Sequence, residues 1–317
     1  MKTPVLKFLA ALFLLVSCQE QPKKGYDASI IDREKIDQVF GHDVSQVLFD
    51  HLYVVLDSAT YAQMTTHDFF KETYASIDKG LPNFEAVDDS TTTCYLRGHK
   101  HFIELLGPNN SYNEPVGKSG IGFALHNKGE HFHLGVSPKL KQTGTPYLSA
   151  FETVDMPFRN ERTTWFKAFY SPSLGTALHT WYAFYNPAFL DSLHQKEHRE
   201  YSRKEFLKES YDEGQLFEGI KTIDMSCTSR DYDRIVQEMR QLGCQLIAKD
   251  ENTLTIASGD VSINLTPSDT IAYSRIDRIR CGLNTHHSGS TRLGNITIID
   301  TGMESIWNLE NLYKKSN

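Results

Sequence analysis

Residues 49–57 read FDHLYVVLD, and residues 102–108 read FIELLGP. Each of these runs predicts a β-strand. Side chains on a strand alternate between two faces, so His51 and Glu104 each share a face with bulky apolar side chains. A histidine or a carboxylate in apolar surroundings is costly unless it has a partner. The two strands therefore predict a pocket with a polar centre.

Two parts of the chain show the same predicted order of elements. Residues 46–116 predict a strand, a helix that begins at Asp57-Ser58, and two further strands. Residues 216–300 predict a strand, a helix with a regular apolar stripe that begins at Thr228-Ser229, and at least three strands. One such unit cannot bury the face of its sheet alone, so a second unit is expected to cover it. The pattern predicts an α+β fold built from paired βαβββ units.

A long middle segment, residues 117–215, is unlike either unit and is predicted to be a large insertion. Residues 165–190 hold a dense block of aromatic side chains. Asn186-Pro187 is typical of a helix start, because proline suits the first helical position, and a highly charged helix is expected from there to about Tyr211. Residues 301–317 predict a short C-terminal helix.

The N-terminus has the layout of a secretion signal. Residues 1–17 contain two lysines and an apolar run that is too short to span a bilayer. The end of the run, LVSC at residues 15–18, resembles a bacterial lipobox, which predicts that Cys18 is lipidated and that residues 18–45 form a tether. The alternative is an ordinary signal peptide with an incidental cysteine. Gln19 favours the outer membrane of the bacterial cell envelope, facing the periplasm or the surface.

Composition narrows the class of protein. The chain has 317 residues and a net charge of −7, and removal of residues 1–17 would make it more acidic because both charges lost are lysines. An acidic exported protein has no electrostatic basis for binding nucleic acid. Besides Cys18, four scattered cysteines remain, and buried thiols are as good an expectation for them as disulfides.

The two units, with DHLYVVLD at residues 50–57 and FIELLGP at residues 102–108, resemble the vicinal oxygen chelate (glyoxalase/bleomycin-resistance-like) superfamily, and are most similar to a bacterial lipoprotein branch of it. The resemblance implies paired modules that form an open, curled mixed sheet around a pocket. It implies either a divalent-metal-dependent lyase, isomerase or dioxygenase for a small oxygenated substrate, or a metal-free module that sequesters a small molecule.

In metal-using members of that superfamily, each module supplies one ligand from its first strand and a glutamate from its last. His51 and Glu104 match those positions in the first unit, and both suit Zn, Mn, Fe or Ni. Thr222 and Asn264 fall there in the second unit, and neither is a usual ligand. A third ligand would have to come from the middle segment, where His179 is the best candidate. Its rivals are His126, His131 and His133.

The resemblance implies roles for these residues if the protein is an enzyme, and it also allows two alternatives that are not enzymes. Glu104 would be the catalytic residue, with Tyr53, Phe102 and Trp181 lining the substrate pocket. In the metal-free alternative, His51 and Glu104 hydrogen-bond each other in the pocket. A third alternative is a surface interaction protein whose pocket is vestigial.

Two other histidine motifs have simpler interpretations. His194 to His198 read HQKEH, which matches the HxxEH motif of some zinc proteases, but the predicted helix around it is highly charged, as a solvated face would be. His99-Lys100-His101, beside Gly98, predicts a hairpin turn with exposed histidines.

Overall fold

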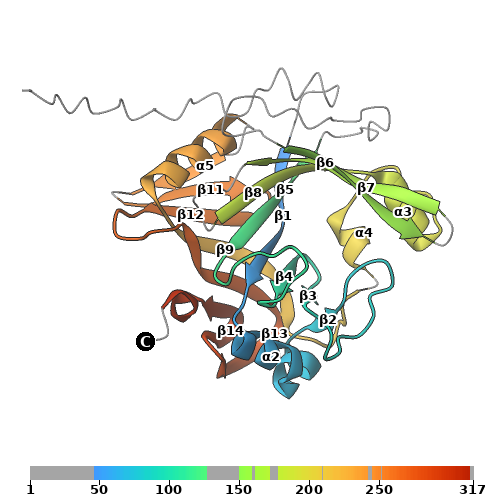
Figure 1. Cartoon of the computed structure of the whole chain (residues 1–317), viewed down its shortest axis with the longest axis horizontal. Coiled ribbons are helices and arrows are strands. Elements are labelled where there is room, and N and C mark those ends of the chain that lie inside the picture. Colours follow the sequence, from blue (N-terminus) through green and yellow to red (C-terminus); the bar gives the residue numbers. More distant parts are fainter. Residues whose placement is uncertain are drawn as a thin grey trace, which may run out of the picture.

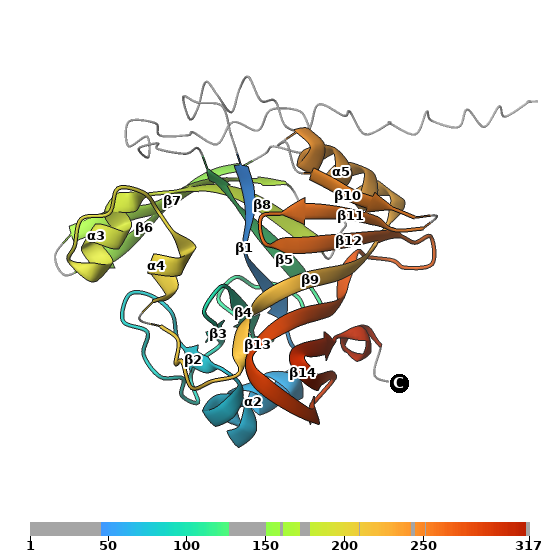
Figure 2. The ribbon, with the colours of Figure 1, turned by 180° about the vertical axis from the view of Figure 1, so that it is seen from behind.

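The computed structural model describes residues 46–126, 150–158, 161–171, 178–208, 210–241, 245–250 and 252–314. These residues form an α+β fold with two mixed β-sheets and few helices (Figures 1 and 2). The expected signal peptide and tether lie outside the described residues, as do His131 and His133 and the side chain of His126. Within the described part, no helix is both long enough and apolar enough to cross a membrane.

The first sheet has eight strands in the order β2-β3-β4-β1-β5-β8-β7-β6. Strand β1 lies near its centre, parallel to β4 on one side and antiparallel to β5 on the other. The strands are β1 (Gln46–Val55), β2 (Ser76–Asp78), β3 (Thr93–Arg97), β4 (Phe102–Leu106), β5 (Ser119–His126), β6 (Ala150–Phe158), β7 (Glu161–Ser171) and β8 (Leu178–Tyr185).

The second sheet has six strands in the order β10-β11-β12-β9-β13-β14. Strand β9 is parallel to β12 and antiparallel to β13, as β1 is to β4 and β5. The strands are β9 (Phe217–Cys227), β10 (Gln245–Lys249), β11 (Leu254–Ser258), β12 (Val261–Pro267), β13 (Arg275–Leu293) and β14 (Ile296–Asn308).

Both predicted strand–helix–strand units are present with one topology. Helix α2 (Ser58–Thr66) follows β1, and helix α5 (Ser229–Gln241) follows β9. Three strands follow each helix. The last of them pairs in parallel with the strand that begins the unit, β4 with β1 and β12 with β9. Asp57 caps α2 as expected, because its side chain accepts hydrogen bonds from the backbone N–H groups of Ala59 and Thr60. A π-helical turn, Phe69–Tyr74, continues beyond α2.

The middle segment does not stand apart from the units. Strands β5 to β8 extend the first sheet, with β8 parallel to β5 and β7 antiparallel to β8. The expected charged helix is two short helices, α3 (Pro187–His194) and α4 (Arg203–Leu207). Asn186 caps α3 as predicted, but Gln195 adopts a left-handed conformation with φ of 56°, which ends the helix there.

The prediction of a C-terminal helix over residues 301–317 is wrong. Strand β14 continues to Asn308 beside β13, and only a short 3-10 helix, Glu310–Tyr313, follows it. Trp307 explains the difference, since its ring is buried and its Nε1–H donates to the Tyr74 hydroxyl at 2.7 Å. Strand pairing and burial of this side chain outweigh the local helical pattern.

The main apolar core joins the inner faces of the two sheets. Phe49 of β1 and Ile223 of β9 are both fully buried in it. The prediction that the histidines of His99-Lys100-His101 are exposed is wrong for His101. Its side chain is fully buried between the sheets. Its Nδ1 accepts a hydrogen bond from the Ile220 backbone N–H at 3.0 Å, and Gly219 leaves room for the ring.

Candidate functional site

A β-bulge in β1 organises the candidate site. The pairing of β1 with β5 shifts between Phe49 and His51, so Asp50 is an extra residue on β1. Before the bulge Phe49 faces the main core, and after it Leu52 does. The bulge therefore sends Asp50 and His51 together to the opposite side of the sheet, whereas consecutive residues of a regular strand point to opposite faces.

A buried carboxylate orients the imidazole of His51. Nδ1 of His51 lies 2.6 Å from Oδ2 of Asp50, which also accepts from the Tyr185 hydroxyl at 2.7 Å. Burial alone would raise the pKa of Asp50, but the hydrogen bond and charge of His51, the Arg203 charge and the Tyr185 hydrogen bond together lower it. An ionised Asp50 only accepts, so Nδ1 of His51 carries a proton, and Nε2 offers a lone pair when the ring is neutral. Among the described residues, none hydrogen-bonds Nε2 of His51.

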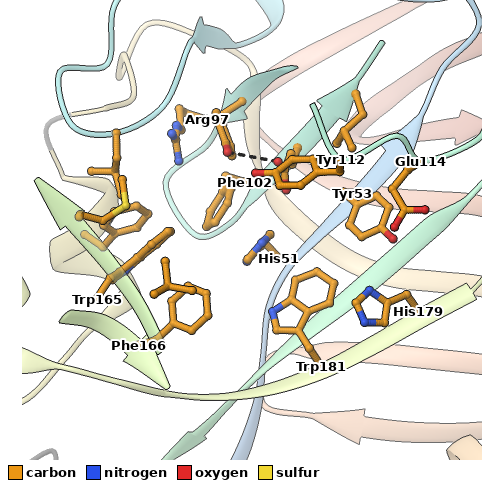
Figure 3. A pocket seen from close by; sticks show the side chains of 17 residues that line it. His51, Tyr53, Arg97, Phe102, Tyr112, Glu114, Trp165, Phe166, His179 and Trp181 are labelled. Atoms are coloured by element: carbon orange, nitrogen blue, oxygen red, sulfur yellow. Dashed lines mark hydrogen bonds between the residues drawn. The ribbon is translucent and has the colours of Figure 1, made fainter. Parts of the chain in front are cut away.

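A cavity of about 400 Å³ opens on this side of the first sheet (Figure 3). Its volume is in the usual range for a small-molecule pocket. All six residues predicted for the pocket and the metal lie in its wall: His51, Tyr53, Phe102, Glu104, His179 and Trp181. Trp165, Phe166 and Phe206 from the middle segment also line it.

Two glycines of β5 let the aromatic rings lie close to the sheet. A Cβ on Gly120 would come within 2.2 Å of the Tyr53 ring, and one on Gly122 within 2.4 Å of the Trp181 ring. Tyr53 on β1 and Trp181 on β8 stack across β5 with ring centroids 5.9 Å apart. His51 stacks on Phe102 at 4.2 Å and meets the edge of Trp181 at 5.0 Å.

Glu104 brings a carboxyl group into this aromatic wall. The Tyr95 hydroxyl donates to its Oε1 at 3.2 Å. Burial raises the pKa of Glu104, although His51, Tyr95 and Arg97 oppose the shift. The direct hydrogen bond between His51 and Glu104 that the metal-free alternative proposed is not present; His51 bonds Asp50 through Nδ1, and Glu104 accepts from Tyr95.

Arg97 and Tyr53 leave buried polar atoms without partners in the wall of the cavity. Arg97 is 2% exposed, and its Nε and Nη2 bind the two carboxylate oxygens of Asp78 at 2.8 Å and 3.1 Å. Its guanidinium also lies over the ring of Phe102, at 4.9 Å. Arg97 Nη1 and the Tyr53 hydroxyl are buried and have no hydrogen-bond partner among the described residues. They lie on opposite sides of His51 in Figure 3.

The predicted metal ligands share the cavity but do not converge. Nitrogen and carboxylate atoms of His51, Glu104 and His179 do not form a group within 4.8 Å of one another, within the described part of the chain. His179 lies beyond the Trp181 ring, with centroids 5.6 Å apart (Figure 3). Burial, with the charges of Lys118 and Arg234, lowers the pKa of His179 to about 3. A catalytic metal usually has three protein ligands, so these residues do not fit one in this pocket.

The second unit offers no ligands at the equivalent positions. Asn264 donates to Oδ1 of Asp224 at 2.7 Å and accepts from the Thr255 hydroxyl at 2.7 Å. Thr222 pairs with Ser262 on the neighbouring strand. The metal quartet of the resembled superfamily is therefore incomplete in this chain.

Sequence reasoning missed Asp50, Arg97, Tyr185 and the β5 glycines as parts of the site. Asp50 was visible beside His51, but regular alternation places it on the opposite face, and nothing local signals the bulge. The sequence GIG at residues 120–122 is the one signal that could have indicated a close approach of rings to the backbone.

Fold and site together define an α+β protein with two strand–helix–strand units and a single-sided aromatic pocket. Residues 49–309 match the model of a family of unknown function (DUF5829), and the chain belongs to that family. No curated protein matches the chain.

Solved structures with a partly similar arrangement show low identity. A hypothetical protein from Staphylococcus aureus is 11% identical with a TM-score of 0.41, over 72% of this chain and 88% of that one. A 4-hydroxymandelate synthase mutant from Streptomyces coelicolor is 9% identical with a TM-score of 0.35, over 74% and 70%. A xylose isomerase-like TIM barrel/4-hydroxyphenylpyruvate dioxygenase fusion protein is 12% identical with a TM-score of 0.36, over 75% and 37%.

Proposed function

We propose that this chain binds a small oxygenated molecule in the cavity of its first sheet, using a glyoxalase-like double module as a frame. One observation carries the proposal. Arg97 Nη1 and the Tyr53 hydroxyl are buried donors in the wall of an aromatic cavity, and neither has a hydrogen-bond partner in the part of the chain that the structure describes. A buried donor without a hydrogen bond costs about 1–3 kcal/mol, and oxygen atoms of a ligand would recover that cost.

The wall indicates the chemistry of the ligand. A planar, apolar body suits the rings of Phe102, Trp165 and Trp181. Oxygen acceptors at its ends suit Arg97 Nη1 and the Tyr53 hydroxyl. The proposal needs no metal in this pocket, because the polar groups that line it already supply the donors.

Calorimetric titration tests the proposal with two molecules that share the same skeleton of non-hydrogen atoms. The probe is 4-hydroxyacetophenone, a planar ring with a hydroxyl and a carbonyl oxygen, and p-cymene replaces both oxygens by carbon. We expect 4-hydroxyacetophenone to bind at one site per chain and at least tenfold more tightly than p-cymene, since each well-made hydrogen bond contributes about 1 kcal/mol.

A pair of glycine variants checks that binding occurs in this cavity. Gly122→Ala would put a methyl group 2.4 Å from the Trp181 ring and displace it, so binding should weaken sharply. Gly289→Ala is the matched control, because its Cβ would meet its nearest neighbour at an ordinary 3.4 Å. Equal binding by both variants would exclude this pocket as the site, and equal affinity for the two molecules would refute the role of its buried donors.

A catalytic role is the second candidate, and the Asp50–His51 pair favours it. A carboxylate that orients Nδ1 leaves Nε2 as a proton acceptor, the arrangement of a general base. Nε2 would take a proton from the carbon beside a carbonyl, and a protonated Glu104 would donate to the enolate oxygen that results. In D2O, wild-type protein should accelerate deuterium exchange into the methyl group of 4-hydroxyacetophenone, and His51→Gln should not. Exchange at the background rate with both proteins leaves binding as the function.

The proposal also includes export and attachment to the outer membrane through lipid on Cys18. The lipobox-like LVSC at residues 15–18 supports it. Expression with radioactive palmitate in a bacterium should label the wild-type chain and leave Cys18→Ser unlabelled. Equal labelling of both proteins would refute the lipid anchor.

A further inference from the structure

A second polar cluster lies outside the pocket, where α3 gives way to α4. It consists of His194 at the end of α3, His198 in the connection and Glu205 on α4. One ligand atom from each of these residues lies within 4.8 Å of the others. The two histidines belong to the HxxEH motif, but its internal glutamate, Glu197, is not part of the cluster.

The distances suit ligands of one metal better than direct hydrogen bonds. Nδ1 of His194 lies 3.4 Å from Nε2 of His198, which is long for a hydrogen bond between imidazoles. Two nitrogens bound at about 2.1 Å to one tetrahedral zinc ion lie about 3.4 Å apart. Oε2 of Glu205 lies 3.9 Å from Nε2 of His198, so a small side-chain movement would complete the set.

The neighbouring residues fix the orientation of two of these ligands. Oδ1 of Asp191 accepts from the His198 backbone N–H at 2.7 Å and lies 3.2 Å from its Nδ1. A carboxylate on the far nitrogen is the usual support of a metal-binding histidine, because it fixes the tautomer that leaves Nε2 as the ligand. The Ser202 hydroxyl accepts from the Glu205 backbone N–H, which holds Glu205 in the first turn of α4.

We infer that His194, His198 and Glu205 form a binding site for a divalent transition metal of the zinc type. Two imidazoles and one carboxylate are a frequent zinc set, with the fourth position left to water. Lys208 Nζ lies 3.8 Å from Glu205 Oε2, but its side chain is 60% exposed and can move away. The metal would tie α3 to α4, and α4 carries Phe206, which lines the pocket.

Metal analysis of the full-length chain in detergent tests this inference. After chelator treatment and dialysis against ZnCl2, wild-type protein should retain one zinc per chain, and Co2+ should give a visible d–d absorption band. His198→Asn and Glu205→Gln should lose both signals. Asp191→Asn should bind zinc about 10–100-fold more weakly, the effect of losing a supporting carboxylate. Glu197→Gln is the matched control and should bind as wild type does.

Folding of the variants is checked separately from metal binding. In chelator, the melting temperatures of Glu205→Gln and Glu197→Gln should equal that of the wild type, and added zinc should raise it for all but Glu205→Gln. Zinc retention by both His198→Asn and Glu205→Gln, or no zinc in the wild type, would overturn the site. Loss of zinc from Glu197→Gln as well would overturn the assignment of the ligands.

Discussion

The buried histidine between the two sheets gives a pH dependence of folding that can be worked out from its bonds. Nδ1 of His101 accepts from the Ile220 N–H at 3.0 Å, so the proton of the neutral ring is on Nε2, which lies 3.3 Å from Oδ1 of Asp260. A second proton would have to go on Nδ1 and would break the bond to Ile220. Burial, opposed only in part by Asp260, therefore lowers the pKa of His101 from 6.5 to about 4.

The sign and size of the effect follow from proton linkage. Below pH 6.5 the unfolded chain binds a proton at His101 that the folded chain refuses until about pH 4. The stability that the neutral ring contributes is therefore complete above pH 6.5 and is lost as pH falls to about 4. A difference of this size corresponds to about 3 kcal/mol in the free energy of unfolding.

Urea unfolding followed by tryptophan fluorescence, from pH 7.5 to pH 4, measures this loss. His101→Asn keeps an oxygen that can accept from Ile220 but cannot be protonated. It should be less stable than wild type at pH 7.5, because the smaller side chain fills less of this fully buried position. That gap should shrink by about 3 kcal/mol towards pH 4. His67→Asn, at an exposed histidine, is the control and should follow the wild type throughout. Parallel wild-type and His101→Asn curves across the whole range would refute the reasoning.

Three further changes should alter stability in the same assay. Tyr74→Phe removes the acceptor of the buried Trp307 Nε1–H and the donor to Ser305, and should cost about 1–3 kcal/mol; an unchanged urea midpoint would contradict that role. Asp57→Ala removes the cap of α2 and a contact at 3.0 Å to Asn295, and should cost about 0.5–2 kcal/mol, whereas Asp57→Asn should cost less. Burial raises the pKa of Glu104, so its charge opposes folding, and Glu104→Gln should be more stable than wild type at pH 8, by a margin that narrows in acid. A Glu104→Gln protein that is less stable at pH 8 would show instead that the carboxylate is stabilised.

Local patterns in the sequence predicted those helices and strands that bury one face and expose the other. The apolar stripe after Ser229 gave α5, and the alternation in residues 253–266 gave β11 and β12. The six predicted pocket residues share one cavity, because the strands that carry them alternate regularly over those residues. Periodicity of apolar residues was therefore sufficient to predict the elements and their buried faces where the backbone is regular.

Long-range pairing and irregular backbone could not be predicted in this way. The joining of β5 and β8 to the first sheet depends on partners far along the chain, as does the approach of Tyr185 to Asp50, 135 residues apart. The separation of the three predicted metal ligands could not be predicted for a related reason. His179 and His51 lie on the same side of the sheet, but the Trp181 ring contacts both of them. Strand periodicity predicts which side a residue faces, and it does not predict which side chains lie between two residues on that side.

The difference between the two units explains why the chain has its pocket on the first of them. On the second unit, Asp224 accepts from Asn264 at 2.7 Å and from Arg280 at 3.3 Å, and this network is only partly buried. These polar atoms of the second unit therefore hydrogen-bond one another at the sheet surface. On the first unit, strands and helices of the middle segment line a cavity over the face, in which Arg97 Nη1 and the Tyr53 hydroxyl have no hydrogen-bond partner among the described residues. The same topology thus gives a partly exposed polar face on the second unit and a cavity on the first, where aromatic side chains of the middle segment line the opposite wall.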